Sequence, residues 1–307
     1  MFPTEKILKA IDKRKAIRSH ETNAIRLVDG SGDDLAGLVI DDFAGRWLMQ
    51  TKSGGAPVLP TGLGYQSLYW KQLHETEKAS PKHVAGEPVN RPFSIQECGR
   101  LFEIDFQAGY SQGIFLDQRI NRSELVVLAS ERSVLNTFAY TCAFGVAAAA
   151  GGAITTNLDL SRQSLDWGKR NYRLNHLDPD DHDFIYGDVF DWLGRFSRRR
   201  RRFDIIILDP PTFSRNRQSK TFRVEADYGA LVQLAMQCLE PNGLLLCCTN
   251  SRQLTHEMFT RILRKAIARH CEIKPGSMPP DFTGEQYLKS VWIRVRQQRR
   301  SFSRRGR

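Results

Sequence analysis

The spacing of apolar residues changes about one third of the way along the chain. Between Pro3 and Ala16 they recur at helical intervals, which predicts a short amphipathic helix. Strand-like runs follow at 24–28, 38–40 and 47–51, separated by turn signals rich in Gly and Asp. Residues 53–97 are rich in Gly, Pro and polar groups and predict only a helix near Leu68–Glu77. The first 100 residues are therefore expected to form a helix and a small β-rich subdomain.

From about Phe102 the pattern predicts strands and helices in alternation. Strands are expected at 133–138, 153–158, 184–186, 203–208, 244–249 and 291–295. Helices are expected from the first of these strands to Gly151-Gly152, and at 161–175, 225–239 and 254–269. The run Phe203–Leu208 is apolar almost throughout, as in a strand buried on both faces. This alternation is typical of an α/β domain with a parallel sheet covered by helices on both faces, here over residues 101–296.

The charge of the chain is concentrated in two places. The formal net charge is +11. Five arginines form the run Arg198–Arg202, and six more lie without an acid between Arg296 and Arg307. The rest of the chain is formally neutral, which favours a polyanionic partner contacted at particular places. Residues 297–307 are expected to be a disordered basic tail.

Several classes of protein are disfavoured by the sequence. No run approaches 18 apolar residues, so no membrane span is expected. Residues 1–18 contain Glu5 and Asp12 and lack a continuous apolar core, unlike a secretory signal. The 6 cysteines show no CxxC pair and no zinc spacing. We therefore expect reduced thiols, no metal and a cytoplasmic protein.

The loops that follow the predicted strands are the candidate ligand site, because doubly wound folds bind ligands at the carboxyl ends of their strands. The loop at 136–145 lacks the G-x-G-x-x-G pattern, which disfavours a nicotinamide or flavin cofactor. S-adenosylmethionine carries no phosphate and tolerates a less strict loop. Asp159, at the end of the second strand, offers a carboxylate for the ribose diol of such a cofactor. Its alternative role is to cap the helix that starts at Ser161.

A second acid follows the third strand. Asp188 could accept a hydrogen bond from an adenine amino group, while the backbone N–H of Val189 donates to the ring. Capping of the next helix is an equally good interpretation of Asp188.

The fourth strand ends in the most specific signal of the chain, Asp209-Pro210-Pro211-Thr212-Phe213. Consecutive prolines fix φ and remove two N–H donors, which leaves carbonyl groups available to a site. Asp209 can accept a hydrogen bond there, and Phe213 offers a face for stacking a planar base. The alternative is a rigid turn followed by a core phenylalanine.

With these loops assembled, the chain resembles class I S-adenosylmethionine-dependent methyltransferases with an Asp-Pro-Pro-Phe-type fourth motif. More narrowly, it resembles the bacterial large-subunit ribosomal RNA methyltransferases, which include a cytosine-C5 enzyme and the guanine-N7 half of a fused bifunctional enzyme. The matching stretches are 26–38, 113–119, 135–141, 158–161, 187–188 and 208–214. The resemblance implies a Rossmann-like seven-stranded sheet with a small N-terminal subdomain, S-adenosylmethionine as cofactor and RNA as partner.

The resemblance also implies roles for individual residues. Those beside the methionine part of the cofactor would be Phe115, Asp117, Gln118 and Arg119, and those lining its pocket would be Phe138 and Tyr140. Asp159 would hold the ribose and Asp188 the adenine. Asp209 would lie next to the transferring methyl group, with Pro210, Pro211 and Phe213 facing the target base.

The residue after the fifth strand bears on the target atom. Cytosine-C5 methylation needs a cysteine that adds to C6, and in the cytosine members it lies in a Ser-Cys-Ser after this strand. Asn250 takes that place here, as in the guanine-N7 branch, and Cys247 and Cys248 come earlier, on opposite faces of the strand. Guanine N7 has an exposed lone pair and needs positioning rather than a nucleophile. We therefore expect a purine nitrogen of ribosomal RNA as target, with Asn250 or Asp209 holding the base.

Other interpretations stay open. Cys248 is the reserve nucleophile for cytosine C5. An exocyclic amine of adenine or guanine is also compatible with the fourth motif. A non-catalytic RNA-binding protein on the same scaffold is a further alternative.

Two features depart from the resemblance. Cys142-Ala143 replaces the usual pair of glycines, and the residues before Asn23 are too few for the PUA domain that many members carry. The guanine-N7 half lacks that domain too.

The run Arg198–Arg202 precedes the fourth strand and is expected at the edge of the sheet opposite the candidate site, as a solvated loop or a distant phosphate contact. The tail is expected to be an auxiliary phosphate contact.

Overall fold

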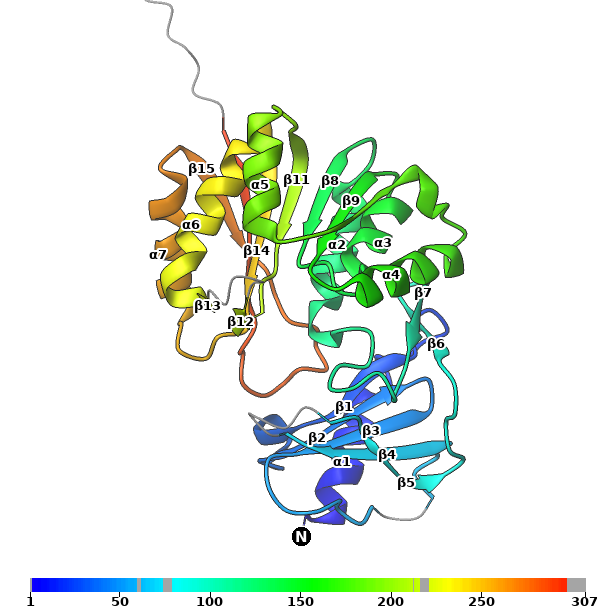
Figure 1. The fold of residues 1–307 in the computed structure, drawn as a ribbon. Helices are drawn as coiled ribbons and strands as arrows, with labels where there is room; N and C mark the ends of the chain where they lie inside the picture. Colours follow the sequence, from blue (N-terminus) through cyan, green and yellow to red (C-terminus); the bar gives the residue numbers. More distant parts are fainter. Residues whose placement is uncertain (1, 60–61, 74–78, 212, 216–220, 297–307) are drawn as a thin grey trace, which may run out of the picture.

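The computed structural model describes residues 2–59, 62–73, 79–211, 213–215 and 221–296. It shows an N-terminal subdomain beside a larger α/β domain (Figure 1). None of the helices in these ranges is long and apolar enough to span a bilayer. The prediction of a disordered tail concerns 297–307, which lie outside the described residues.

The α/β domain is built on a seven-stranded sheet in the order β10-β9-β8-β11-β14-β16-β15. Its strands are β8 (Ser133–Thr137), β9 (Ile154–Asp159), β10 (Asp183–Tyr186), β11 (Phe203–Leu208), β14 (Leu239–Thr249), β15 (Cys271–Pro275) and β16 (Lys289–Val295). The expected Rossmann-like fold is thereby confirmed. The expectation of a fully parallel sheet was wrong at one strand, since β16 pairs antiparallel with both β14 and β15. The strand order reverses between β8 and β11, which is where such folds bind ligands.

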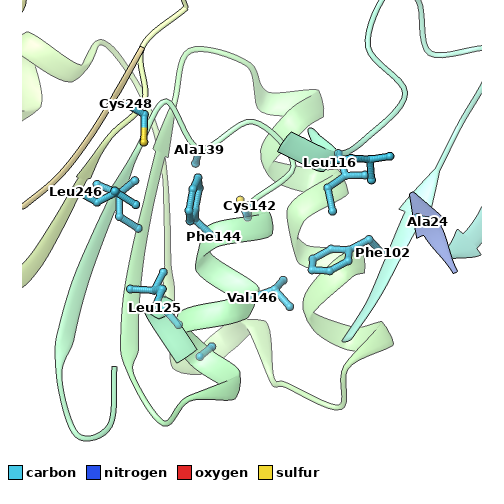
Figure 2. Packing of buried hydrophobic residues seen from close by; sticks show 14 of the residues in the cluster. Ala24, Phe102, Leu116, Leu125, Ala139, Cys142, Phe144, Val146, Leu246 and Cys248 are labelled. Atoms are coloured by element: carbon cyan, nitrogen blue, oxygen red, sulfur yellow. The ribbon is translucent and has the colours of Figure 1, made fainter. Parts of the chain in front are cut away.

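Helices cover both faces of this sheet. One core includes residues of α2 (Arg119–Leu128), α3 (Ala143–Ala150) and α4 (Arg162–Leu174) (Figure 2). The other includes residues of α5 (Val189–Arg198), α6 (Val224–Gln237) and α7 (His256–Ile267). Along β11, Ile205 and Ile207 belong to the first core and Ile206 and Leu208 to the second. This alternation explains why the strand is apolar almost throughout: both of its faces are buried.

The N-terminal subdomain consists of α1 (Thr4–Arg14) and a five-stranded sheet. Its strands follow in order as β1 (Ala24–Asp29), β2 (Leu38–Phe43), β3 (Arg46–Thr51), β4 (Ser67–Gln72) and β5 (Lys82–Gly86). The prediction of a helix near 68–77 was wrong. Residues 67–72 form β4, which pairs in parallel with β3, and residues 74–78 lie outside the described ranges. Tertiary pairing and the strand preference of Tyr69 and Trp70 prevailed over a weak helical pattern.

Several elements were given no bounds by the sequence patterns. The helix α5 was expected only as the one that Asp188 could cap. The others are α2, β15 and two hairpins, β6 (Phe93–Glu97) with β7 (Arg100–Ile104) and β12 (Phe213–Arg215) with β13 (Thr221–Arg223). Short 3₁₀ turns lie at Gly30–Asp33, Leu116–Gln118 and Pro179–Asp181. The β6–β7 hairpin spans the expected boundary at residue 100. It bonds Asn23 of the subdomain on one side, and Asn171 of α4 and the following Asn175 on the other.

The loop between β15 and β16 joins the α/β domain to the subdomain, which it approaches in Figure 1. Asp281 in this loop is fully buried. Its carboxylate pairs with Arg119 and accepts a hydrogen bond of 2.8 Å from the backbone N–H of Arg26. Arg14 of α1 donates to the Asp281 carbonyl at 2.9 Å. The subdomain is thus held through hydrogen-bonded charges that have little access to water.

A second set of contacts flanks this pair. The Arg26 guanidinium bonds Asp41 at 2.9 Å and Asp29 at 2.8 Å and stacks 4.3 Å from the centre of the Phe282 ring. Arg119 also donates to the carbonyl of Ala24 at 3.2 Å. Since Arg119 begins α2 at the carboxyl edge of the sheet, that edge faces the N-terminal subdomain.

Breaking the central ion pair should cost much of the stability of the fold. Arg119→Ala leaves the buried Asp281 without its charged partner, so we expect a loss of about 3–5 kcal/mol in the free energy of unfolding. Urea denaturation followed by circular dichroism measures it. The control is Arg170→Ala, because Arg170 is 48% exposed where it pairs with Glu103 and such pairs contribute about 1 kcal/mol or less. Equal losses in the two variants would refute the prediction.

Candidate functional site

The predicted site residues gather at one edge of the sheet. Each lies at or directly after the carboxyl end of a strand: Phe138 and Tyr140 after β8, Asp159 on β9, Asp188 after β10, Asp209 after β11 and Asn250 after β14. These five strands run parallel to one another, so their carboxyl ends share the same edge. The fold therefore brings together residues from five separate loops.

The loop after β8 has an unusual backbone. Phe138, Tyr140 and Cys142 all lie in the left-handed region, with φ of 52°, 48° and 60°. Each such residue other than glycine costs on the order of 1 kcal/mol or more. The turn that glycines make in dinucleotide-binding folds is here made by residues with side chains. The loop therefore keeps a tight turn although Cys142-Ala143 replaces the usual pair of glycines.

Asp159 holds this strained loop. One carboxylate oxygen accepts the N–H of Tyr140 and the other that of Ser161, both at 2.8 Å. The capping alternative for Asp159 was wrong, because Ser161 itself caps α4 through its side chain. Burial raises the pKa of Asp159. Each oxygen keeps acceptor capacity for a hydroxyl donor, so the carboxylate suits the ribose diol expected of it.

Asp188 caps α5. Its side chain accepts hydrogen bonds from the N–H groups of Phe190 and Asp191 at 2.9 and 3.2 Å. The capping interpretation is therefore confirmed. Val189 is the first residue of the helix and is buried. The adenine contacts of Asp188 and Val189 stay a prediction.

Phe115 presents an aromatic surface beside the strained loop. Its side chain is 51% exposed, and its ring centre lies 5.5 Å from that of Tyr140. The segment is positioned by Gly113, whose φ is +123° and whose missing Cβ would lie 2.5 Å from the Glu103 carbonyl oxygen. Only glycine fits that position.

The centre of the site contains two hydrogen-bonded sets of polar side chains, which we together call the polar chain. The Gln118 amide donates to the Asp209 carboxylate at 2.9 Å and accepts from Asn121 at 2.6 Å. The hydroxyl of Tyr287 donates to Asp117 at 2.9 Å. Gln118 has no obvious function in the sequence, yet it fixes Asp209. Tyr287 was missed entirely, because it lies 170 residues from its partner and no local signal identifies it.

The pKa values of both carboxyl groups in the polar chain, those of Asp117 and Asp209, are raised. Burial raises the pKa of Asp209 to about 7, and the nearby charge of Asp117 acts in the same direction. The hydrogen bond from Gln118 opposes these effects. Burial also raises the pKa of Asp117, against the hydrogen bond from Tyr287. Asp209 can therefore exchange a proton near neutral pH.

The side chain of Arg119 points away from the polar chain, unlike those of Asp117 and Gln118 in the same segment. Its guanidinium is buried and contacts Ala24 and Asp281. Its charge is thus directed toward the N-terminal subdomain. Asp117 and Gln118, by contrast, have side chains in the polar chain beside Asp209.

The residues expected at the target base lie at the ends of β11 and β14. Pro210 is buried and Pro211 exposed, and Asn250 is exposed. Tyr228 ties the two strand ends together, because its hydroxyl donates to the carbonyls of Leu208 at 2.7 Å and Cys248 at 3.1 Å. The backbone of Phe213 belongs to β12, and its side chain lies outside the described part of the structure.

Cys247 and Cys248 face opposite sides of the sheet, as predicted. Cys247 belongs to the core under α5–α7 and Cys248 to the core under α2–α4, where Figure 2 shows it. Both are fully buried, and burial raises the pKa of each thiol, that of Cys247 to about 12. The Cys248 sulfur lies 3.9 Å from the Gln118 side-chain oxygen, beneath the polar chain. Among the residues described, no group of three or more His, Cys, Asp or Glu could hold a metal ion.

Comparisons with known proteins agree with this geometry. A family model described as S-adenosylmethionine-dependent methyltransferase matches residues 55–287. A Bacillus subtilis protein, provisionally named ribosomal RNA large subunit methyltransferase YwbD, is 33% identical over 300 residues, covering 92% of this chain and 76% of the relative. The crystal structure of SMU.776, provisionally described as a methyltransferase and complexed with SAH, superposes with a TM-score of 0.87 at 31% identity, covering 95% of this chain and 80% of that one.

Two further relatives are longer than this chain. Ribosomal RNA large subunit methyltransferase K/L of Methylococcus capsulatus is 38% identical over 226 residues, which cover 72% of this chain and 30% of the relative. Ribosomal RNA large subunit methyltransferase I of an Enterobacter species is 31% identical over 258 residues, which cover 80% of this chain and 65% of the relative.

The shifted pKa of Asp209 should appear in the pH dependence of stability. The native state retains a proton that the unfolded chain releases above pH 4, so this contribution is full below about pH 4 and is lost as the pH rises through about 7. In Asp209→Asn without cofactor, the fall of Tm over this range should be shallower than in the wild type. Thermal denaturation at successive pH values measures it. Asp166→Asn, at an exposed site on α4, should follow the wild type; parallel profiles for all three proteins would contradict the prediction.

Proposed function

The chain belongs to the S-adenosylmethionine-dependent methyltransferase family, and we propose that it methylates a purine nitrogen of ribosomal RNA, of the guanine-N7 type. Support for RNA comes from the relatives named as ribosomal RNA large subunit methyltransferases. The K/L protein is much longer than this chain, and the match covers 30% of its length, so this chain corresponds to one part of that protein. The strongly basic composition of this chain, with a net charge of +11, is consistent with a nucleic-acid partner.

The residues at the carboxyl edge fit the cofactor. The Asp159 carboxylate would accept the ribose hydroxyls, while its bonds to the N–H groups of Tyr140 and Ser161 hold the loop after β8. Asp188 and Val189 would hold the adenine, and Phe115 packs beside Tyr140. Asp117 and Gln118, held by Tyr287 and Asn121, would contact the methionine part. When bound, S-adenosylmethionine supplies an electrophilic methyl group on a sulfonium with a good leaving group.

The chain itself supplies orientation at the target. Gln118 holds Asp209 in one position, and Tyr228 fixes the ends of β11 and β14 relative to each other. The Asn250 amide carries both a donor and an acceptor for the edge of a base. Asp209, with its pKa of about 7, can accept a hydrogen bond when ionised or donate one when protonated. Guanine N7 needs no proton removed before it attacks the methyl group, so holding the base in line accounts for most of the catalysis.

The observation that carries the choice of a purine nitrogen is the burial of the thiols near the site. Cytosine-C5 chemistry requires a thiolate that reaches C6 of the base. Cys247 and Cys248 are fully inaccessible, with pKa values raised by burial. Buried thiols of this kind are inert. The residue at the end of β14 is instead Asn250, which is exposed.

Cofactor affinity should depend on Asp159. Asp159→Ala removes the acceptor for the ribose hydroxyls and the support of the strained loop, so we expect the Kd for S-adenosylmethionine to rise at least tenfold, about 1.4 kcal/mol. Isothermal titration calorimetry measures this. Asp166→Ala, an exposed acid on α4, is the matched control and should bind as the wild type does. Unchanged affinity in Asp159→Ala would remove this residue from the cofactor site.

The choice between purine nitrogen and cytosine C5 can be tested by trapping. RNA carrying 5-fluorocytosine forms a stable covalent adduct only with an enzyme whose cysteine attacks C6. We expect no adduct on denaturing gels, and Cys248→Ser should retain methyl transfer. An adduct that disappears in Cys248→Ser would overturn the purine proposal.

The decisive experiment is mass-spectrometric mapping of ribosomal RNA from cells with and without the gene. The proposal expects one methylated purine nitrogen to disappear from large-subunit RNA in the deletion strain and to return with the wild-type gene. Complementation with Asp159→Ala should fail. Loss of a 5-methylcytosine or of an exocyclic methylamine would identify a different target atom. An unchanged RNA would leave the proposed substrate without support.

A further inference from the structure

The edge of the sheet opposite the candidate site carries a hollow lined by arginines. Its volume is about 420 Å³, and it is lined in part by Arg200, Arg202 and Arg269. A second hollow of about 110 Å³ shares Arg202 and Arg269 with the first and adds Arg296. Together they form one basic surface, which we call the amino-edge hollow.

The arginines of this surface come from three distant parts of the sequence. Arg200 and Arg202 lie in the loop between α5 and β11, Arg269 follows α7, and Arg296 follows β16. In Figure 1 the end of β16 lies at the edge of the sheet farthest from the N-terminal subdomain. Because β16 is antiparallel to β14, the chain leaves the sheet on the side where β11 begins. Arg296, where the second basic feature of the sequence begins, therefore lies at the same edge as the run Arg198–Arg202.

Much of the nearby charge has a structural explanation. Arg195 and Arg198 lie in the last turn of α5, and Arg264 and Lys265 in the last turn of α7. Cations there offset the partial negative charge of helix carboxyl ends. Arg201 pairs with Asp183 at 2.6 Å. The charges of these residues are therefore explained by contacts within the fold, and none of them requires a ligand.

The arginines of the hollow lack such an explanation. Over the described ranges, no carboxylate lies within 4.0 Å of Arg200, Arg202 or Arg269, and Arg202 donates only to the Leu239 carbonyl, at 2.9 Å. Glu240 is the acid that lines the smaller hollow. Glu272 of β15 is paired with Arg296 at 2.5 Å. Three arginines thus line one hollow, and none of them is in an ion pair within the described ranges.

The rest of the lining suits a phosphate backbone. Met236, Ala266 and Ile267 provide an apolar floor, against which arginine stems can lie while their charged ends reach outward. Gln233 and Gln237 add amide groups that can bond sugar hydroxyls. The guanidinium fork matches phosphate oxygens in a bidentate manner. The arginines, the apolar side chains and the amide groups of this lining are therefore all suited to a phosphate backbone.

We propose that the amino-edge hollow binds phosphates of the RNA backbone at a distance from the methylated base, through Arg200, Arg202 and Arg269. The inference rests on the proposed function, since RNA is the polyanion that this enzyme would hold. Such contacts add affinity that is independent of sequence and sensitive to salt. They would hold a large RNA on the far side of the domain while the carboxyl edge selects the base.

The test compares RNA binding in two triple variants of the full chain. Arg200→Gln/Arg202→Gln/Arg269→Gln removes the three charges of the hollow. Lys9→Gln/Lys52→Gln/Arg173→Gln removes three exposed charges elsewhere. Binding of a labelled large-subunit ribosomal RNA transcript is measured between 50 and 200 mM salt. The hollow variant should bind at least tenfold more weakly at low salt, and its slope of log affinity against log salt should fall by about 2–3, at 0.7–0.9 per lost phosphate contact.

The control variant should change the slope by less than 1, and both variants should bind S-adenosylmethionine as the wild type does. Arg200→Gln/Arg269→Gln, which keeps the hydrogen bond of Arg202 to Leu239, should lower the slope by about 1.4–1.8 and guards against misfolding. Equal slopes in the hollow and control variants would overturn the proposal. Competition by inorganic phosphate or GMP at concentrations similar to that of the RNA would indicate a small-molecule site and would also overturn it.

The failure of this inference can be told apart from failure of the proposed function. If the wild type binds and methylates ribosomal RNA and the hollow variant does so with an unchanged salt slope, only the inference falls. If the wild type neither binds nor methylates RNA, both fall.

Discussion

The buried ion pair between Arg119 and Asp281 is the interaction on which the arrangement of the site depends. It connects the start of α2 to the loop before β16, and the same Asp281 receives the backbone N–H of Arg26 from the N-terminal sheet. Asp117 and Gln118 directly precede Arg119, and Tyr287 follows in the loop of Asp281. Any shift of this pair would therefore move Gln118 relative to Asp209 and Tyr287 relative to Asp117. The N-terminal subdomain is in this way a part of the site's framework.

Burial determines the chemistry that this framework supports. It raises the pKa of Asp209 to about 7, so a carboxyl group that is ionised in water is balanced between two protonation states here. The same burial raises the pKa of the Cys248 thiol and leaves it unreactive beneath Gln118. Covalent catalysis is thereby disfavoured, and positioning is favoured. The strained loop at Phe138, Tyr140 and Cys142 is held by Asp159. It also favours positioning, because its groups are fixed before the cofactor binds.

Local patterns were reliable where neighbouring residues decide the structure. Strand β11 was predicted to the residue because both of its faces are apolar, and α4 was predicted within a residue or so because its helical period is clear. β4 was mistaken for a helix, since its identity depends on pairing with β3. β15 was missed because most of its residues are exposed and its run is short. In the candidate site, Asp159, Asp188, Asp209 and Asn250 could be predicted to share one edge of the sheet because each lies at or after the end of a recognisable strand. The Gln118–Asp209 and Tyr287–Asp117 bonds were beyond reach, because they join residues 91 and 170 positions apart.

The sequence by itself determined the order of strands and helices, the loops that carry the chemistry and the absence of a cysteine after the fifth strand. These are properties of short segments, where side-chain size, backbone preference and apolar spacing act between neighbours. The tertiary structure decided the rest: which carboxyl groups are buried together, where the charge of Arg119 is directed, and that Arg200, Arg202 and Arg269 share one hollow. Desolvation and long-range electrostatics depend on distances in space, and those distances exist only once the chain has folded.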